Sequence, residues 1–202
     1  MNINYFGHSY LLILGKDYSI ALDPYGDIGL LPPKINSDYV FSSHGHYDHN
    51  NFSVVNSKKV IKSSNNLFKI IPSFHDNENG ALRGTNNILS FNLDGYRLAF
   101  MGDFGEDDNK NVINQLKNVD VLFVPIGGKY TIDYKVAKKY CDKIKPKTII
   151  PIHYKIEGSN IDIDNLDNFL KLFKSYTMVN SPYNYDDRKG VVVISPEIKE
   201  AL

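Results

Sequence analysis

The sequence predicts a mixed α/β (α+β) domain in which β-sheets are flanked by helices. The first half of the 202-residue chain carries short β-branched or aromatic runs separated by turn residues. The second half alternates strand-like runs with helix-like runs. Hydrophobic residues make up 42% of the chain, which is typical of a globular protein. The length suits one domain, which we expect to span residues 1–202.

Strand signals dominate the first half of the chain. Short apolar runs bounded by turn residues predict strands at residues 10–14, 18–22, 38–42, 58–63 and 67–74. Residues 88–103 read as a hairpin, because Asp94 and Gly95 separate two alternating runs and suit a type I′ turn.

Helices and strands alternate in the second half. The pattern predicts helices at residues 109–118, 131–144 and 162–176. Between and after them it predicts buried strands at residues 119–125, 147–153 and 191–195. Strands first and β/α alternation later indicate sheets covered by helices.

Three of the six histidines lie within six positions, in the stretch SSHGHYDHNN. His44, His46, Asp48 and His49 read H-x-H-x-D-H, a dense set of side chains that bind metals. A packed core does not call for such a set. One ion needs about three protein ligands, so this cluster alone does not complete two sites.

Three further ligand candidates stand where predicted strands end. His75 follows residues 67–74, Asp103 follows the hairpin, and His153 follows residues 147–152. Loops at strand ends are where sites are built on a rigid scaffold. Together with the cluster they make seven ligands, enough for two ions with one bridging carboxylate.

Charge and cysteine content limit the expected partners. Lys plus Arg equals Asp plus Glu, 23 each, which argues against broad capture of nucleic acid or an anionic membrane. The apolar run at residues 10–14 is too short for a membrane span, and no positive segment precedes it as in a signal peptide. The single cysteine, Cys141, favours a reducing compartment. We therefore expect a cytoplasmic protein.

The chain resembles the metallo-β-lactamase-fold hydrolases, and more narrowly a small stand-alone group that includes L-ascorbate-6-phosphate lactonase-like proteins. The resemblance covers about residues 3 to 195. It rests on GHSYLLI at 7–13, LDPYG at 22–26, SSHGHYDHN at 42–50, residues 75–106, PIGGKYTID at 125–133 and PKTIIPIHY at 146–154. The resemblance implies a four-layer αββα sandwich with the metal site at one edge, between the two sheets.

The resemblance also implies which residue binds which ion. His44, His46 and His75 would hold the first metal; Asp48, His49 and His153 would hold the second; and Asp103 would bridge. Asp23, in LDPYG, matches an aspartate that supports the metal loop in the family. The alternative interpretation is that Asp23 is an ordinary turn residue.

Two divalent ions that share a water lower its pKa toward neutrality. We expect a metal-bridging hydroxide to attack a small ester, lactone or phosphorylated metabolite, with Asp48 and Asp103 as catalytic residues. The redox di-iron branch of the superfamily has Glu at the position of His46, so histidine here favours hydrolysis. Zinc is the first choice, and manganese, iron or nickel also suit N/O ligands.

Other residues have weaker assignments. His8, in the GHS turn, is a further catalytic candidate. It is expected to line the pocket or to donate to a ligand carboxylate rather than to bind a metal itself, with a purely structural histidine as the alternative. Arg83 and Asn86 are candidates to meet an anionic group. Tyr130 and Tyr154 are candidates near the leaving group, although packing explains either. Lys129 and Lys155 are expected to be solvated.

Three functions remain in competition. The leading one is a hydrolase of a small molecule, with an anionic molecule among the candidates. The second is a phosphodiesterase or nuclease of the same fold, and the third is a metal-binding scaffold or sensor without turnover. Neither the substrate nor the oligomeric state follows from the sequence.

Overall fold

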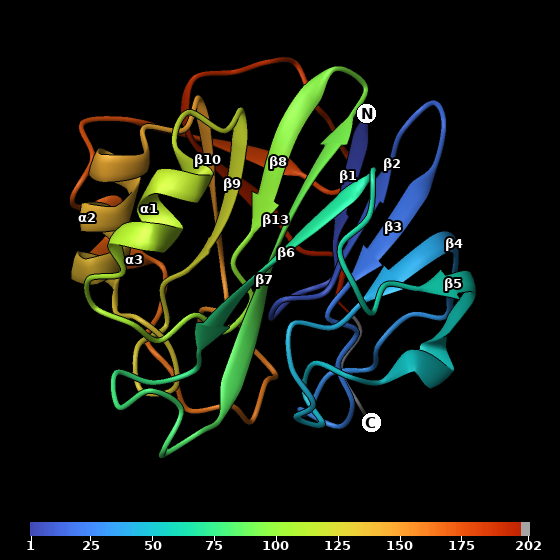
Figure 1. The fold of residues 1–202 in the computed structure, drawn as a ribbon, viewed down its shortest axis with the longest axis horizontal. Helices are drawn as coiled ribbons and strands as arrows, with labels where there is room; N and C mark the ends of the chain where they lie inside the picture. Colours follow the sequence, from blue (N-terminus) through green and yellow to red (C-terminus); the bar gives the residue numbers. More distant parts are fainter. Residues whose placement is uncertain (199–202) are drawn as a thin grey trace.

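Two β-sheets pack face to face in this protein, whose computed structural model describes residues 1–198 (Figure 1). The six-stranded sheet has the order β12 (Tyr183–Asn184), β1 (Asn2–Tyr5), β2 (Leu11–Leu14), β3 (Ser19–Leu22), β4 (Ile35–Phe41) and β5 (Val55–Val60). The seven-stranded sheet has the order β11 (Tyr176–Asn180), β13 (Gly190–Ser195), β10 (Thr148–Ile152), β9 (Val121–Pro125), β8 (Tyr96–Phe100), β7 (Thr85–Leu93) and β6 (Phe68–Phe74). The predicted sandwich is confirmed.

The direction of pairing changes along each sheet. Strands β1 to β3 and β6 to β8 pair antiparallel as neighbours in sequence. The turn of the β7–β8 hairpin has positive φ at both Asp94 and Gly95, as a type I′ turn requires. Strands β8, β9, β10, β13 and β11 pair parallel. Parallel strands need crossover connections, and two of these contain the helices predicted from the sequence.

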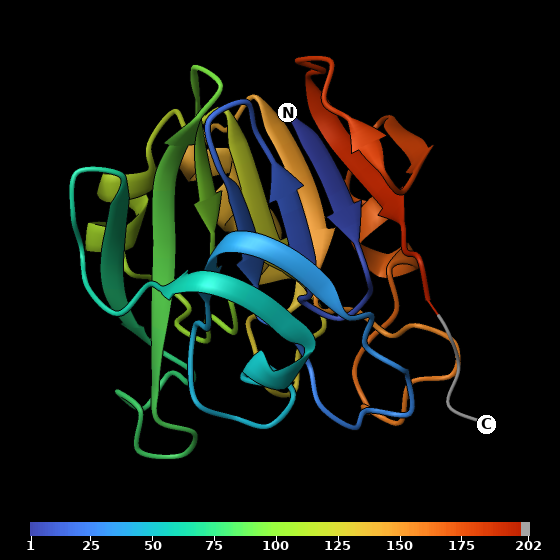
Figure 2. The ribbon, with the colours of Figure 1, turned by 90° about the vertical axis from the view of Figure 1, so that its right-hand side faces the viewer.

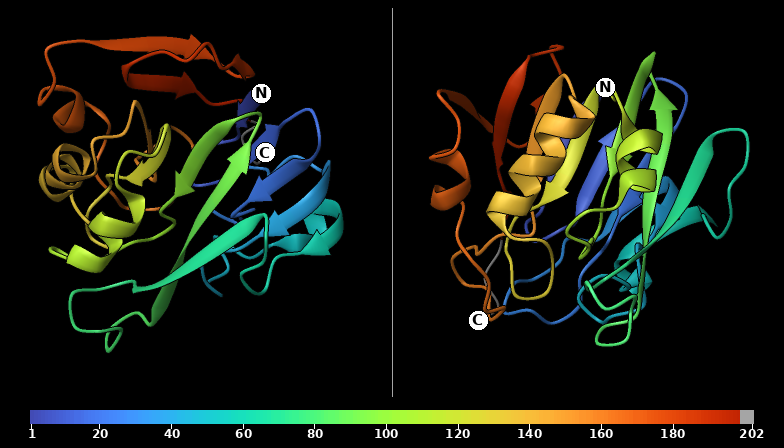
Figure 3. Two further views of the ribbon diagram at one scale, coloured as in Figure 1. Left: turned by 45° about the horizontal axis from the view of Figure 1, so that its top comes forward. Right: turned by 60° about the vertical axis from the view of Figure 1, so that its left-hand side comes forward.

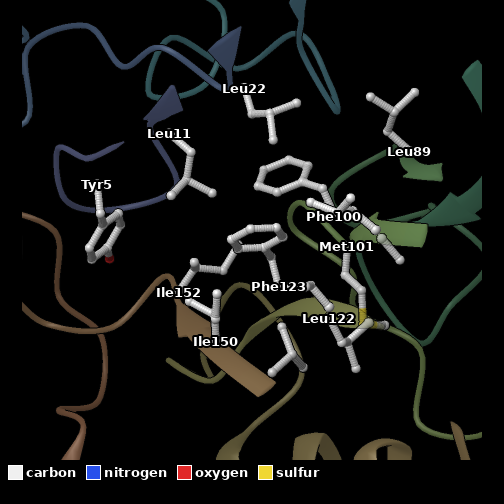
Figure 4. Close-up of a cluster of buried hydrophobic side chains, with 14 of the residues drawn as sticks. Tyr5, Leu11, Leu22, Leu89, Phe100, Met101, Leu122, Phe123, Ile150 and Ile152 are labelled. Atoms are coloured by element: carbon white, nitrogen blue, oxygen red, sulfur yellow. The ribbon is translucent and has the colours of Figure 1, made fainter. Parts of the chain in front are cut away.

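The core lies between the sheets. Figure 4 shows Leu11 and Leu22 from the six-stranded sheet facing Phe100, Phe123 and Ile152 from the other sheet, and all five are fully buried. Strands β9 and β10 are buried along their whole length. This explains their continuous apolar sequences, because helices cover the face that the other sheet does not.

Three helices lie on the outer face of the seven-stranded sheet: α1 (Lys110–Leu116), α2 (Tyr134–Ile144) and α3 (Asp167–Leu170) (Figures 1 and 3). Asn109 caps α1 and Asp133 caps α2 by accepting from backbone N–H groups of the first turn. On the side of the six-stranded sheet, the only helical segment among residues 1–198 is the 3₁₀ helix η1 (Phe52–Val54) (Figure 2). The outer layer there is therefore much thinner than the expected αββα arrangement implies. None of the helices in the described part of the chain has the length and apolar character needed to cross a membrane.

The helix predicted at residues 162–176 is wrong for most of its length. Only Asp167–Leu170 is helical, and Tyr176 begins β11. The backbone of Asp164 instead forms hydrogen bonds with residues outside any helix. Its N–H donates to the Gly127 carbonyl at 2.8 Å, and its carbonyl accepts from the Lys155 N–H at 2.8 Å. Strands β1, β11 and β12 were not predicted.

Candidate metal centre

Six segments bring polar side chains to one edge of the sandwich. His8 lies in the β1–β2 turn and Asp23 follows β3. The H-x-H-x-D-H segment follows β4, and His75, Asp103 and His153 follow β6, β8 and β10. The sheets thus contribute from both sides, as expected for strand ends that meet at one edge.

Three of these residues have a positive φ, which non-glycine residues rarely adopt: His8 (52°), Asp23 (43°) and His153 (51°). The surrounding hydrogen bonds hold them there. The His8 carbonyl accepts from the His153 N–H at 2.8 Å and from the Tyr5 hydroxyl at 2.9 Å. The Asp23 N–H donates to Phe41 at 3.0 Å. Such conformations cluster at functional sites.

One group of ligand atoms comes from His44, His46 and His75. These three imidazoles each offer a nitrogen within 4.8 Å of the others. His44 Nδ1 lies 2.9 Å from the Ser43 hydroxyl, which leaves its Nε2 for another partner. These are the three histidines that the sequence analysis assigns to the first metal, and that assignment stays a prediction.

A second group comes from His8, His49 and His153, again with ligand atoms within 4.8 Å of one another. Asp48 joins it, because its Oδ2 lies 3.5 Å from His49 Nε2 and 3.3 Å from His8 Nε2. His8 Nε2 is also 3.0 Å from His49 Nε2. His8 therefore lies among the side chains of the predicted second site and contacts them directly, which a residue that only lined the pocket would not do.

Asp103 lies where the two groups meet. Its Oδ2 is 3.2 Å from His75 Nε2, 3.1 Å from His49 Nε2 and 3.2 Å from His153 Nε2. The same oxygen is 3.9 Å from His44 Nε2. A single carboxylate thus contacts both groups, which is the arrangement a bridging ligand requires.

Buried groups behind the site orient it. Asp23 Oδ2 accepts from His49 Nδ1 at 2.8 Å and from the Ser43 hydroxyl at 2.6 Å, and its Oδ1 accepts from the Ser43 N–H at 2.7 Å. A carboxylate on the far nitrogen of a histidine fixes the ring and leaves Nε2 as the ligand atom. Asn86 Oδ1 accepts from the Asp103 N–H at 3.0 Å. Asp23 is therefore more than a turn residue, and Asn86 holds Asp103 rather than meeting a substrate.

Electrostatics acts differently on the individual candidate ligands. Burial lowers the pKa of His44 to about 2 and that of His8 to about 4, so both imidazoles are neutral near pH 7. Burial opposes ionisation of Asp103, but the neighbouring His153 and His49 hold the pKa of its carboxyl well below the usual value. Metal ligands must be deprotonated, and His44, His8 and Asp103 meet that condition. Burial opposes protonation of His49 and His75, but the Asp103 carboxylate raises the pKa of both imidazoles, so a cation that binds there would displace any bound proton.

The donor set fits divalent cations. Four buried atoms of the candidate ligands have no hydrogen-bond partner among the described residues: His44 Nε2, His75 Nδ1, His153 Nδ1 and Asp103 Oδ1. Such atoms are costly unless a water or an ion satisfies them. Ligands about 2.0–2.2 Å from a shared ion lie roughly 3 Å apart, as do the contacts of Asp103 Oδ2. Imidazole and carboxylate ligands suit zinc and its neighbours.

An open cleft of about 920 Å³ leads to this centre. The more buried lining residues, Asp48, His75 and Asp103, form its floor, and its rim is formed by exposed or half-buried side chains, among them His46, Tyr47, Leu82, Arg83, Tyr130 and Asp162. Binding pockets for small molecules typically have about 300–1,000 Å³.

The remaining candidates fall into two classes. Arg83 and Tyr130 line the cleft, whereas Tyr154 is buried with its ring 6.2 Å from that of Tyr5. Lys129 and Lys155 are both exposed, as expected, and Lys155 Nζ also donates to the Ile161 carbonyl at 2.8 Å. Cys141 is buried in α2, and burial raises the pKa of its thiol to about 12, which rules it out as a nucleophile near neutral pH.

Lys129 pairs with Asp162 on the rim of the cleft.

Sequence reasoning missed a further residue, Asp76, whose carboxylate organises the loop after β6. The turn-rich stretch DNENG directly after His75 was the available signal.

Comparisons with known proteins find relatives with the same fold. Residues 2–153 match the family model described as the beta-lactamase superfamily domain. A UPF0173 metal-dependent hydrolase of Nanoarchaeum equitans is 30% identical over 76% of this chain and 84% of its own length. One from Carboxydothermus hydrogenoformans is 28% identical over the same shares. The crystal structure of a candidate zinc-dependent hydrolase of the metallo-β-lactamase superfamily from Thermotoga maritima aligns with a TM-score of 0.80 at 30% identity, covering 97% of this chain and 99% of that one.

Proposed function

Because the chain belongs to the UPF0173 family of metal-dependent hydrolases in the β-lactamase superfamily, we propose that it is a dinuclear enzyme that cleaves a small ester, lactone or phosphorylated metabolite. The observation that carries this proposal is the Asp103 carboxylate, which contacts ligand atoms of both histidine groups on the floor of an open cleft.

His44, His46 and His75 would hold one ion, and Asp48, His49 and His153 the other, with Asp103 shared. Zinc is the first choice, a preference supported by the description of the Thermotoga maritima relative as zinc-dependent. When bound, two such cations would acidify a water between them and polarise an oxygen of the substrate.

The role of Asp48 follows from its surroundings. Its carboxylate lines the cleft and contacts His8 and His49. Burial opposes its ionisation, but these two imidazoles hold the pKa of Asp48 well below the usual value. A carboxylate that rarely takes up a proton is a weak general base. Asp48 therefore orients the attacking water by accepting a hydrogen bond.

Hydrolysis of a small molecule is better supported than nuclease activity. The residues that line the cleft include a single Lys or Arg, Arg83, beside Asp48, Asp103 and Asp162. Proteins that follow a polynucleotide need a basic groove with several phosphate contacts. A small substrate with few charges fits this lining. We also propose that the protein is similar to the lactonase-like group and that it is located in the cytoplasm.

The test combines metal analysis with a substrate screen. Protein purified without chelator and dialysed against zinc should approach two ions per chain by elemental analysis. The same preparation should hydrolyse at least one member of a panel of lactones, thioesters, phosphomonoesters and phosphodiesters. A stable value of one ion at excess metal would contradict the dinuclear centre.

The screen also separates the alternatives. Activity confined to oligonucleotides would favour the nuclease. Metal uptake with no turnover across the panel would favour a scaffold or sensor. Asp103→Ala serves as the control for metal contamination, because activity that survives in this variant does not come from the proposed centre.

A further inference from the structure

We propose that Arg83 and Tyr130 form an anion-binding subsite on the rim of the cleft, which takes a carboxylate or phosphate group of the substrate remote from the bond that is cleaved. This proposal rests on the proposed function, which it deepens by naming a substrate class. The substrate would carry an oxyanion at one end and the scissile bond at the other.

The subsite spans two loops. Arg83 belongs to the loop between β6 and β7, and Tyr130 to the loop between β9 and α2. The Arg83 guanidinium lies over the Tyr130 ring, with its Cζ 4.9 Å from the ring centroid. This is within the range of a cation–π contact, which fixes the plane of the guanidinium. Both side chains line the cleft whose floor holds His75 and Asp103.

The loop that carries Arg83 is held in place by Asp76. The Oδ1 of Asp76 accepts from the N–H groups of Glu78 and Gly80, each at 2.8 Å. Its Oδ2 accepts from the N–H groups of Leu82 at 3.1 Å and Arg83 at 2.7 Å. Four backbone donors on one carboxylate make this an ordered loop. The guanidinium is thus presented from a fixed backbone, which reduces the entropy lost on binding.

The charge of Arg83 is available to a ligand. No carboxylate forms a salt bridge with Arg83 among residues 1–198, whereas Asp162 on the same rim pairs with Lys129. The other carboxylates of the cleft, Asp48 and Asp103, belong to the proposed metal centre. A guanidinium without a carboxylate partner binds carboxylate or phosphate through two parallel hydrogen bonds. This is why we infer an oxyanion rather than a neutral polar group.

The test uses ligands that differ only in the second anionic group. The zinc-loaded protein is titrated by calorimetry with linear dicarboxylates from malonate to adipate and with the monocarboxylates of matching length. The carboxylate nearest the floor has the same partners in both sets, so the ratio of dissociation constants isolates the second group. 3-Phosphonopropionate, compared with succinate, tests whether phosphate or carboxylate is preferred.

Three variants test whether the preference for a second anionic group depends on Arg83. In wild type we expect one chain length to bind about 10–100-fold more tightly than its monocarboxylate, the range of one or two charge-assisted hydrogen bonds. Arg83→Gln should abolish this ratio, and Arg83→Lys should retain part of it. Lys135→Gln removes a charge from an exposed lysine that does not line the cleft and should leave the ratio unchanged.

The outcomes are decisive. A ratio near one at every chain length in wild type, or an equal ratio in wild type and Arg83→Gln, overturns the subsite. Absence of turnover on every substrate counts against the proposed function alone, since the binding comparison needs no catalysis. Where turnover is found, Arg83→Gln should raise KM for the anionic member of a substrate pair more than for the neutral member, with kcat little changed.

Discussion

Asp103 is the residue on which both ligand groups depend. Its Oδ2 contacts three imidazole Nε2 atoms within 3.2 Å, and its Oδ1 has no hydrogen-bond partner among the described residues. If Asp103 only capped a turn, its side chain would accept from nearby backbone N–H groups, and no such bond is found within residues 1–198. Between two dications the carboxylate would remain ionised at any working pH.

Replacement of Asp103 should therefore remove metal, activity and stability together. Asp103→Ala deletes a ligand from each proposed ion and is expected to bind fewer than one ion per chain and to lose most activity. Asp103→Asn is expected to retain one ion. Elemental analysis and melting temperature decide the matter. Loss of a turn cap alone costs only ~0.5–2 kcal/mol and would leave both ions in place.

His8 is the least expected member of the site. It is 2% exposed, and its Nε2 contacts both His49 and Asp48. The sequence suggested a position near the site from its GHS turn. The distances depend on the hydrogen bond between the His8 carbonyl and His153, a contact across 145 residues of chain that no local pattern reveals.

We expect His8→Ala to bind both ions at saturating zinc, with the affinity of the second site weakened about 10–100-fold, as for other residues that support ligands. His8→Gln keeps a donor for Asp48 and should recover part of that affinity. Competition with a chromophoric chelator gives the two affinities. Complete loss of one ion at saturating zinc would show instead that His8 is itself a ligand.

Among the elements, the β6–β7 loop matters most for substrate binding. Asp76 has no direct contact with the proposed ligand atoms, but it holds four backbone N–H groups of the loop that presents Arg83. Its two oxygens contact different parts of the loop: Oδ1 accepts from the N-terminal half and Oδ2 from the C-terminal half. Metal binding and substrate positioning should therefore be separable.

Asp76→Ala is expected to leave metal content near the wild-type value while KM rises. Hydrogen exchange provides the structural readout, because the amides of Glu78, Gly80, Leu82 and Arg83 should exchange faster. Asp76→Asn, which keeps one carbonyl oxygen, should protect about half of them. Unchanged exchange at all four amides in Asp76→Ala would mean that other contacts order the loop.

The elements predicted best are those with local signals. The β7–β8 hairpin was predicted because Asp94 and Gly95 suit a type I′ turn, and α2 was predicted from the helical pattern of residues 131–144. The structure adds the Asp133 cap at the start of α2. The prediction of a helix at residues 162–176 failed because the backbone of Asp164 pairs with Lys155 in the same loop region and with Gly127, which is distant in sequence. The site was foreseeable in its ligand types and strand ends, whereas its distances depend on how the two sheets pack.

In the whole molecule, the site joins the two sheets. His8, Asp23 and the segment from His44 to His49 come from the six-stranded sheet, whereas His75, Asp103 and His153 come from the seven-stranded sheet. Each proposed ion would take ligands from both sheets. Unfolding must separate these ligands, so metal binding should stabilise the sandwich as a unit.

Removal of metal should therefore lower the melting temperature of the whole protein. At a free zinc concentration of about 100 times Kd, binding stabilises the folded state by about 2.7 kcal/mol per site. A chain of this size shifts by roughly 2–4 °C per kcal/mol, so losing even one site should lower Tm by about 5–11 °C. Differential scanning calorimetry before and after dialysis against a chelator measures the shift, and added zinc should reverse it. Asp103→Ala is the matched control, since its Tm should respond little to chelator or zinc. If elemental analysis shows that the metal has left the wild type while its Tm is unchanged, the ions do not connect the two sheets, and the proposed centre at their shared edge is wrong.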